Sequence, residues 1–293
     1  MAKIAVDLER AVAQRTLRGT PEGISARRLA QGDDWVVDDL ICTAGPGDRS
    51  FEERHKHAAI VIIAAGTFQY RSRLGRELMT PGSLLLGNAN QPFECGHDHG
   101  TGDRCISFRY TPESFEQLAA EAGAPRAERR FRVSRLPPVR ALSPLIARVS
   151  AGVSGSLPVS WEEISLKLLS TVVHAAAGLS ARASTPTRSA LARVSDIVRS
   201  IENRPGGAFS VRGMAQEARL SPFHFLRTFE SITGVTPHQY VRRLRLRVAA
   251  ARLASERAKV IDIAFDSGFG DVSNFNRAFL AEFGVTPTAY RAS

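Results

Sequence analysis

Residues 225–240 read FLRTFESITGVTPHQY, and residues 275–290 read FNRAFLAEFGVTPTAY. At a constant offset of 50 residues, eight of these sixteen positions are identical. Upstream the offset falls to 49, because Ala215 corresponds to Ala264. Agreement of this kind is hard to obtain by chance and indicates one structural unit that occurs twice. The second copy is predicted to have one extra residue in its turn.

Each copy has the same predicted plan, which is a short helix, a tight turn and a second helix. The short helix contains Met214-Ala215 in the first copy and Ile263-Ala264 in the second. In the second helix, apolar residues recur at steps of three and four positions and share one face. They are Phe225, Phe229 and Ile232 in one copy, and Phe275, Phe279 and Phe283 in the other. We assign this face to the core. The plan is that of a helix-turn-helix, in which the short helix holds the second one against DNA.

The opposite face of each second helix carries side chains that can bind DNA. They are Phe223, His224, Arg227 and Ser231 in the first copy, and Ser273, Asn274, Asn276 and Arg277 in the second. Amide, hydroxyl and guanidinium groups bind base edges and phosphates. Residues 238–255, between the copies, are predicted to form one helix with five arginines, which would fix the separation of the units. Whether these arginines contact DNA or only form a solvated face stays open.

The charge of the chain also favours a polyanionic partner. The sequence has 39 Lys+Arg against 29 Asp+Glu, a formal net charge of +10. Residues 190–293 hold 15 of these cations and 9 of the anions. Such a balance is typical of proteins that bind double-stranded DNA, although a solvated basic surface would have the same composition.

Composition excludes several other classes of protein. Apolar residues make up 43% and charged residues 23%, as in ordinary globular proteins. The longest apolar run, residues 58–65, is too short to span a membrane. Residues 1–15 have charges of both signs and no signal-peptide pattern. Three cysteines are too few for a disulfide scaffold. We therefore expect a cytoplasmic protein without a membrane partner.

The pattern divides the chain into two domains. Short apolar runs separated by Gly and Pro over residues 24–110 predict a β-barrel, and residues 112–180 predict helices. We expect an N-terminal regulatory domain at 1–180, a linker at 181–191 and a tandem helix-turn-helix domain at 192–293. An apolar stripe in the N-terminal helices consists of Trp161, Ile164, Leu168, Val172 and Ala176. This stripe packs either on its own domain or on a second copy of the chain in a homodimer.

The C-terminal third resembles the DNA-binding domain of AraC/XylS-type transcriptional regulators. The residues that carry the resemblance are Ile263-Ala264, Gly268-Phe269, Asn274-Phe275, Arg277, Phe279, Gly284, Pro287 and Tyr290-Arg291. The resemblance implies two helix-turn-helix units joined by a long helix. It also implies base-reading positions at Phe223, Leu226, Arg227, Ser273, Asn274, Asn276 and Arg277. Two positions depart from the pattern, because Leu226 is apolar and Arg219 stands where the second copy has Gly268.

The N-terminal half is similar to the cupin-like barrel that such regulators often carry. His55-Lys56-His57, Gly66 and Pro81-Gly82-Ser83 resemble the two cupin motifs. Metal-binding cupins place a glutamate a few residues after the paired histidines, and here that stretch is wholly apolar. This departure disfavours a metal-dependent cupin enzyme.

A second cluster of donors follows in the same half. The cluster consists of Cys95, His97, His99 and Cys105. Together with His55 and His57 it forms a candidate metal-binding set that would suit zinc, copper or nickel. Two alternatives stay open, which are a Gly-rich loop with ordinary polar residues and a Cys95–Cys105 redox pair. Cys42 is assigned to the core. No obligatory cofactor is predicted.

Two classes of function remain. The first is a sequence-specific transcriptional regulator controlled by its N-terminal domain, with a small molecule or metal as effector and RNA polymerase as a partner if it activates. The second is a cupin-type metal-dependent enzyme or a metal/redox sensor. No catalytic residues are assigned, because the sequence has no nucleotide-binding glycine loop and no G-x-S-x-G elbow. We therefore predict a regulator and not an enzyme.

Overall fold

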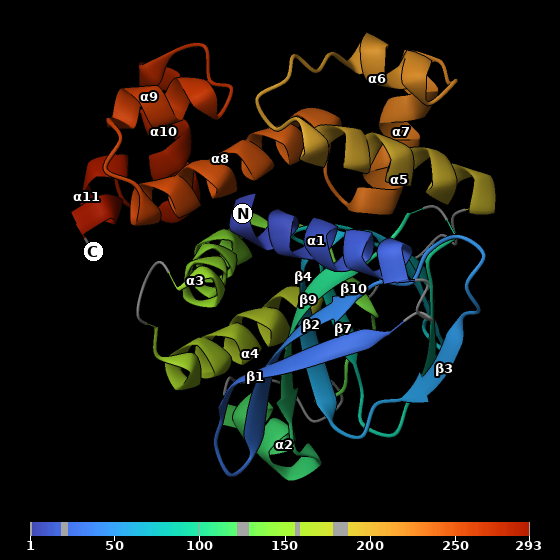
Figure 1. The fold of residues 1–293 in the computed structure, drawn as a ribbon. Helices are drawn as coiled ribbons and strands as arrows, with labels where there is room; N and C mark the ends of the chain where they lie inside the picture. The colour runs from blue at the N-terminus through green and yellow to red at the C-terminus, as the bar shows by residue number, and fades with distance from the viewer. Residues whose placement is uncertain are drawn as a thin grey trace.

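The computed structural model describes residues 2–18, 23–98, 100–121, 129–155, 159–177 and 187–292. A β-rich N-terminal part is followed by an all-helical C-terminal part that lies across one end of it (Figure 1). This is the predicted fold class, a cupin-like β-barrel with accessory helices and a tandem helix-turn-helix domain. Within the described stretches, no helix is both long and apolar enough to cross a membrane.

The N-terminal part contains two antiparallel sheets. The strands are β1 (Ile24–Gln31), β2 (Trp35–Cys42), β3 (Phe51–Arg54), β4 (Ala58–Gly66), β5 (Phe68–Ser72), β6 (Gly75–Met79), β7 (Leu84–Gly87), β8 (Pro92–Gly96), β9 (Asp103–Tyr110) and β10 (Arg135–Leu136). One sheet has the order β1-β2-β9-β4-β7-β10 and the other β3-β8-β5-β6. Side chains from both sheets meet in a shared core.

Strand β4 lies in the middle of the larger sheet and is buried on both faces. Ala59, Val61 and Ile63 point into the core between the sheets. Ile60 and Ile62 point the other way and pack under the helices. Because successive side chains of a strand alternate between faces, a strand covered on both sides must be apolar throughout. This explains the uninterrupted apolar run at residues 58–65.

Helices cover the outer face of the larger sheet. They are α1 (Ala2–Arg18), α2 (Pro112–Glu121), the short 3-10 helix η2 (Arg140–Leu142), α3 (Ser143–Ser154) and α4 (Trp161–Ala177). The predicted stripe lies on α4, and Ile164, Leu168 and Val172 are completely buried in the same core as Ile60. The stripe therefore packs on its own domain.

The sequence pattern does not predict helix α1, because its many charged residues leave only a narrow apolar face. Leu8 is buried in the core under the helices. Arg104 of β9 donates to Asp7 at 3.0 Å, and Arg15 donates to Asp48 at 2.7 Å. Tertiary contacts thus stabilise a helix that the local sequence pattern does not predict.

The C-terminal part consists of helices. They are α5 (Arg188–Asn203), α6 (Val211–Glu217), α7 (Pro222–Thr233), α8 (Pro237–Ser255), α9 (Val260–Asp266), α10 (Val272–Phe283) and α11 (Pro287–Ala292). Helix α5 begins at Arg188, with the Thr187 side chain accepting from the Ala190 amide, so the last four residues of the predicted linker 181–191 are helical. Residues 181–186 lie outside the described residues.

The two parts are in direct contact. The Tyr240 hydroxyl of α8 donates to the Pro81 carbonyl at 3.2 Å, and Arg135 of β10 donates to the Thr233 carbonyl at 3.0 Å. At the other end, the Ser143 hydroxyl of α3 donates to the buried carboxylate of Glu282 in α10. The N-terminal part therefore contacts the C-terminal part near both predicted units.

Candidate DNA interface and ligand-binding cavity

The first helix-turn-helix unit consists of α6 and α7. The turn between them includes Arg219, whose φ of +54° lies in the left-handed region. The Leu220 amide donates to the Ala215 carbonyl at 2.9 Å and closes the turn. The Ser221 side chain then accepts from the His224 amide at 3.3 Å and caps α7. A side-chain oxygen at this position satisfies a backbone donor that the helix leaves free.

The second unit, α9 and α10, repeats this geometry with different residues. Gly268 has a φ of +91° in the turn, and the Phe269 amide donates to the Ala264 carbonyl at 3.1 Å. Asp271 caps α10 by accepting from the amides of Ser273 at 3.0 Å and Asn274 at 2.8 Å. Five residues separate α9 from α10, against four between α6 and α7, so the predicted extra turn residue is confirmed.

Helix α10 presents a polar face to solvent. Phe275 and Phe279 are completely buried on its inner side. The predicted base readers on its outer side are all exposed; they are Ser273, Asn274, Asn276 and Arg277. Arg277 forms no hydrogen bond or ion pair with the residues that the structure describes, so its guanidinium is free to bind an external acceptor.

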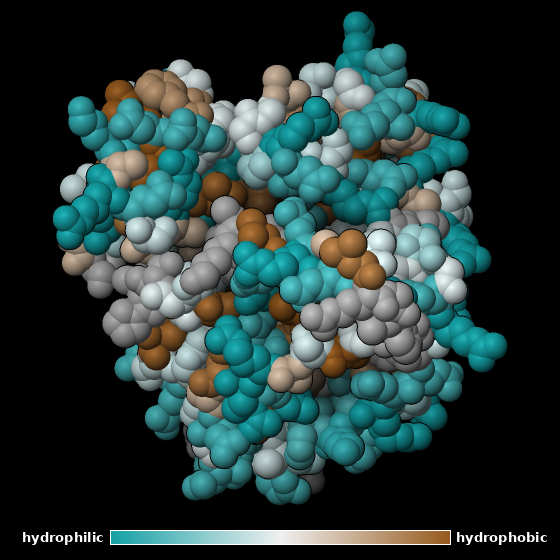
Figure 2. Space-filling model, viewed as in Figure 1, coloured by the Kyte–Doolittle hydropathy of each residue, from teal (hydrophilic) through white to brown (hydrophobic). Residues whose placement is uncertain are grey.

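The first unit presents a less polar face. On α7, His224 is exposed and Leu226 is half-buried. The predicted readers Phe223 and Arg227 lie on the same helix, but their side chains are outside the described residues. Hydrophilic residues cover most of the surface in view over α5, α6 and α7, whereas hydrophobic ones appear at the outer surface near α9 (Figure 2). There Ile261 and Phe265 are 44% and 48% exposed.

The arginines of α8 mostly stabilise the domain. Arg245 donates to three backbone carbonyls, those of Pro205 at 2.9 Å, Gly268 at 2.8 Å and Gly207 at 2.6 Å. It thereby ties the turn of the second unit to α8 and to the segment after α5. Arg252 binds Asp266 of α9 at 3.0 Å.

The remaining arginines of α8 are divided between the domain boundary and solvent. Arg243 donates to the Pro138 carbonyl, and Arg247 is buried against Gly82. Only Arg242, of the five, is exposed. A solvated or DNA-facing role is therefore wrong for most of them: Arg243 and Arg245 donate to backbone carbonyls, Arg252 binds carboxylates, and Arg247 is buried.

A groove of about 420 Å³ separates the two units. Its walls come from α6, α8 and the start of α10, and the residues that can bind a phosphate there are His238, Arg242 and Asn274. The groove lies beside the N-terminus of α10, where the Asp271 carboxylate already accepts from two backbone amides, so Arg242 is the group there that attracts a phosphate. This surface suits a DNA backbone that passes between the units.

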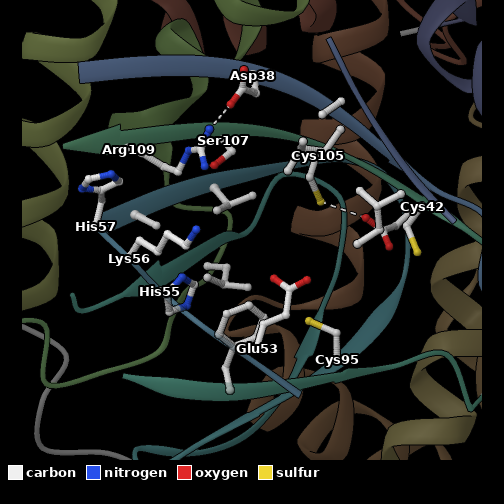
Figure 3. Close-up of a pocket in the computed structure, with 18 of the residues that line it drawn as sticks. Asp38, Cys42, Glu53, His55, Lys56, His57, Cys95, Cys105, Ser107 and Arg109 are labelled. Carbon is white, nitrogen blue, oxygen red and sulfur yellow. Dashed lines mark hydrogen bonds and ion pairs between the residues drawn. The ribbon is translucent and has the colours of Figure 1, made fainter. Parts of the chain in front are cut away.

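A cavity of about 350 Å³ lies between the two sheets of the N-terminal part. Figure 3 shows Lys56, His57 and Arg109 toward one end and the cysteines toward the other. Its walls include Val61, Leu85 and Phe93. The cavity combines apolar walls with a few polar groups, among them Glu53 and His55 between its two ends, as is usual for small-molecule sites.

The His55 side chain packs in the wall of this cavity and does not belong to an assembled metal site. Its ring stacks on Phe93 at 4.1 Å, and its Nε2 lies 2.8 Å from the Tyr70 hydroxyl. Burial lowers the pKa of His55 to about 4, so the ring is neutral at neutral pH. His57 lines the same cavity, and no ligand cluster among the described residues includes either histidine.

The structure brings together a different donor set from the predicted one. One atom from each of Cys42, His97 and Asp103 lies within 4.8 Å of the others, and all three residues are buried. Of the predicted donors, only His97 belongs to this set. Cys95 and Cys105 lie in the core between the sheets, and His99 is outside the described residues.

Sequence analysis missed Cys42 and Asp103 because they are 61 positions apart. The register of β2 and β9 places them directly opposite each other. Asp103 also precedes Cys105 by two positions and therefore points to the same side of β9. This alternation along β9 was the one local signal that could have assigned Asp103 to the donor set.

Comparisons with known proteins agree with this architecture. Residues 40–169 match the AraC-like ligand binding domain, and residues 214–293 match a helix-turn-helix domain. The RCS-specific HTH-type transcriptional activator RclR of Escherichia coli (strain K12) is 34% identical over 99 residues, which is 34% of this chain and 35% of that protein. The HTH-type transcriptional activator AarP of Providencia stuartii is 33% identical over 100 residues, or 34% of this chain and 74% of that protein.

A solved structure is also similar over the C-terminal part. The DNA-binding domain of AdpA, solved in complex with a target DNA, is 28% identical, covers 34% of this chain and 90% of its own, and has a TM-score of 0.33. The chain spans about a third of the length of the first curated relatives that it matches. The fold and the matches define a protein with a helix-turn-helix domain. The chain belongs to the AraC family, with a DNA-binding domain and an AraC-like ligand-binding domain.

Proposed function

We propose that both helix-turn-helix units read bases in successive major-groove segments of one duplex, under control of the N-terminal domain. The observation that carries this proposal is the exposed polar face of α10, with an unpaired Arg277, on a helix whose opposite side is completely buried. Arginine binds guanine edges bidentately, and asparagine binds adenine in the same way. The base readers are Ser273, Asn274, Asn276 and Arg277 in the second unit, and Phe223, Leu226 and Arg227 in the first.

Helix α8 supports the use of both units at once. It has 19 residues and therefore spans roughly 28 Å at 1.5 Å per residue. Successive major-groove segments on one face of B-DNA are about 34–36 Å apart. The contacts of Arg245 and Arg252 hold the second unit in place on this helix. A modest tilt or bend of the DNA supplies the remaining distance.

Control by the N-terminal domain is supported by where that domain attaches. Arg135 holds the end of α7 and Ser143 holds Glu282 of α10, so one domain contacts both base-reading helices. A ligand in the cavity between the sheets changes DNA binding only if it favours one arrangement of these contacts over another. A small-molecule effector, a second copy of the chain in a homodimer and, for an activator, RNA polymerase are the partners proposed with this function.

The test is selection of bound fragments from random-sequence DNA by the full chain. We expect a motif with two blocks about one helical turn apart, since each unit reads one block. The affinity for this motif should fall steeply with salt, while its preference over random DNA is retained. A single block would restrict base reading to one unit. Recovery of no motif would contradict sequence-specific binding.

A further inference from the structure

We propose that Cys42, His97 and Asp103, with Cys105 as fourth donor, form a binding site for a zinc-class transition-metal ion. We further infer that the loop after His97 communicates metal occupancy to α5 of the DNA-binding part. The metal site stands on its own geometry, whereas the communication rests on the proposed regulatory function.

Cys42, His97 and Asp103 converge in the interior of the N-terminal domain, and Cys105 lies beside Asp103. Asp103 Oδ1 lies 2.7 Å from His97 Nε2, and the Cys105 thiol donates to Asp103 Oδ2 at 3.0 Å. Cys42 is directly opposite Asp103 in the register of β2 and β9. Each of the four residues is at most 6% exposed. Cys42, Asp103 and Cys105 are held by the paired strands β2 and β9, and His97 follows β8.

The separations suit a tetrahedral ion. The ligand atoms of Cys42, His97 and Asp103 all lie within 4.8 Å of one another. Zinc bonds of about 2.0–2.3 Å place tetrahedral donors roughly 3.3–3.8 Å apart, so His97 Nε2 and Asp103 Oδ1, now 2.7 Å apart, have to separate slightly to admit the ion. Thiolate and imidazole donors favour zinc or a similar ion over magnesium and calcium, which prefer oxygen.

An independent observation comes from the histidine ring. His97 is 95% buried, yet its Nδ1 has no hydrogen-bond partner among the described residues. A buried polar atom without a partner costs free energy unless a ligand or a water satisfies it. Because His97 Nε2 already contacts Asp103, Nδ1 is the ring nitrogen that stays without a partner among the described residues until a ligand binds.

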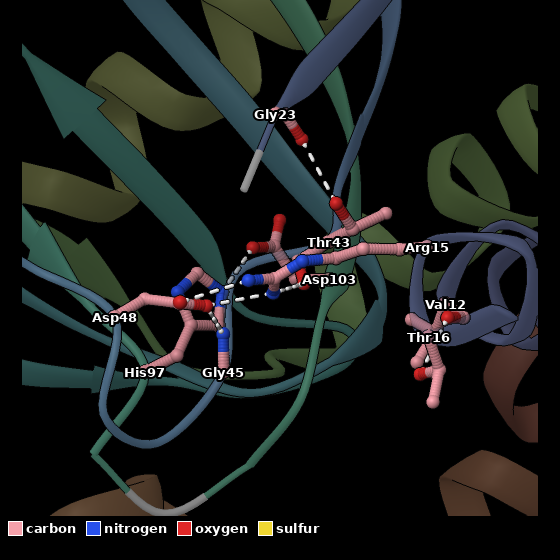
Figure 4. Close-up of polar contacts among 9 residues, drawn as sticks. All are labelled: Val12, Arg15, Thr16, Gly23, Thr43, Gly45, Asp48, His97 and Asp103. Atoms are coloured by element: carbon pink, nitrogen blue, oxygen red, sulfur yellow. Dashed lines mark hydrogen bonds and ion pairs between the residues drawn. The ribbon is translucent and has the colours of Figure 1, made fainter. Parts of the chain in front are cut away.

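The net charge of the metal site follows from its donors and the ion. Metal binding would replace the protons of Cys42 and Cys105, which are released to solvent. With two thiolates, one carboxylate and a divalent cation, the site would carry one negative charge. Figure 4 shows Arg15 of α1 beside His97 and Asp103. Arg15 donates to the Thr43 carbonyl at 2.5 Å, one residue beyond Cys42, and its charge is paired with Asp48 at 2.7 Å.

The loop that follows His97 reaches the DNA-binding part. Asp98 accepts from Arg188 of α5 at 2.8 Å. Gly100 approaches Arg199 of the same helix so closely that a Cβ there would collide with its guanidinium. A metal that fixes His97 therefore fixes the residue next to it, and with it the contact to α5. This contact is a surface ion pair, so its contribution to the coupling is modest.

Metal binding is tested on the full chain, purified without an affinity tag, by elemental analysis, zinc titration against a chelating dye and cobalt absorption spectra. We expect one ion per chain and cobalt spectra of a tetrahedral, thiolate-containing site. Cys42→Ser and Asp103→Asn should each weaken binding at least ~10-fold. Cys95→Ala is the matched control, because it removes a buried thiol outside the four donors, and it should bind as the unmodified chain does.

Two outcomes would overturn the metal site. One is a sub-stoichiometric metal content that excess zinc does not raise. The other is a Cys95→Ala variant that loses the ion while Cys42→Ser and Asp103→Asn keep it. Thermal unfolding of each variant shows whether it folds, and because two near-isosteric variants probe different donors, a folding failure in one leaves the other informative.

Communication is tested by measuring DNA affinity with and without zinc on the selected motif. We expect a change of at least ~5-fold, which is the lower range of measured couplings between sites. Asp98→Asn should retain the metal and lose this change. Bound zinc without any effect on DNA affinity would overturn the communication and leave the proposed function intact. Absence of sequence preference in both conditions would instead overturn the proposed function and leave the metal site intact.

Discussion

The two helix-turn-helix units share an apolar framework but differ on their exposed surfaces. The rings of Phe225 and Phe229 are 5.5 Å apart at 54°, and those of Phe275 and Phe279 are 5.5 Å apart at 55°. In contrast, Arg219 and Gly268 occupy the equivalent turn position. Between α7 and α10 the repeat preserves these phenylalanines and the arginine at positions 227 and 277, and it differs at the other aligned positions, which include the buried Ile232 and Glu282.

This difference shows which positions a duplicated unit can change. A buried phenylalanine contacts several helices, so its replacement leaves a cavity. An exposed position on α7 or α10 has no such neighbours, and it can acquire a new side chain without loss of the fold. We therefore expect the two duplicated units to fold alike but to differ in how they read bases.

The largest expected effect is on the shared core. Phe229→Ala and Phe279→Ala should each lower the free energy of unfolding by about 3–5 kcal/mol, since both rings are completely buried. The two losses should be similar, because the ring geometries match. Urea unfolding of the full chain measures both, and Glu230→Ala on the exposed surface is the control. A loss confined to one variant would show that the units do not have equivalent cores.

The next effect concerns DNA specificity. Arg277→Ala should weaken binding to the selected motif by about 1–3 kcal/mol if Arg277 reads a base, and Leu226→Ala should have a smaller effect, since a half-buried leucine offers only an apolar contact. Fluorescence anisotropy at fixed salt gives the ratio of specific to random DNA binding. Arg257→Ala removes the same charge from an exposed position off the recognition helices and is the control. An unchanged ratio for Arg277→Ala would reject its role as a reader.

The turns should respond in opposite directions. Gly268→Ala should destabilise the chain by more than ~1 kcal/mol, because φ is +91° and the new Cβ would lie 2.8 Å from Arg245 Nε. Arg219→Gly should be neutral or stabilising by less than ~1 kcal/mol, because it removes a left-handed non-glycine residue. Thermal unfolding measures both changes. Destabilisation by Arg219→Gly would mean that the arginine side chain contributes contacts that outweigh its backbone strain.

The smallest effect is expected at the helix caps. Ser221→Ala and Asp271→Ala should each cost about 1 kcal/mol of stability. The loss should be larger for Asp271, which accepts from two amides and places a negative charge at the N-terminus of α10. Added salt should therefore reduce the Asp271 effect and leave the Ser221 effect unchanged. Equal salt dependence of the two losses would argue against a charge contribution at α10.

Local patterns predicted most of the C-terminal part. The apolar steps of the repeat gave α6, α7, α9 and α10, and the Gly, Ser and Pro positions marked their ends within a few residues. Helix α1 could not be predicted, because the core against which Leu8 packs and the partners of Arg15 and Asp7 belong to the rest of the N-terminal domain. The roles of Arg243 and Arg245 were also hidden, since a sequence shows that an arginine is present on a helix but not which carbonyl it contacts.

The sequence by itself determined the duplicated unit, the buried face of each helix and the strands of the barrel, because these follow from spacing along one element. Only the tertiary structure decided which cysteine stands beside His97 and Asp103, and which loop touches α5. Both depend on the pairing of segments far apart in the chain. Side-chain alternation fixes the face of a strand, but the partner strand and its register are set by the packing of the whole domain.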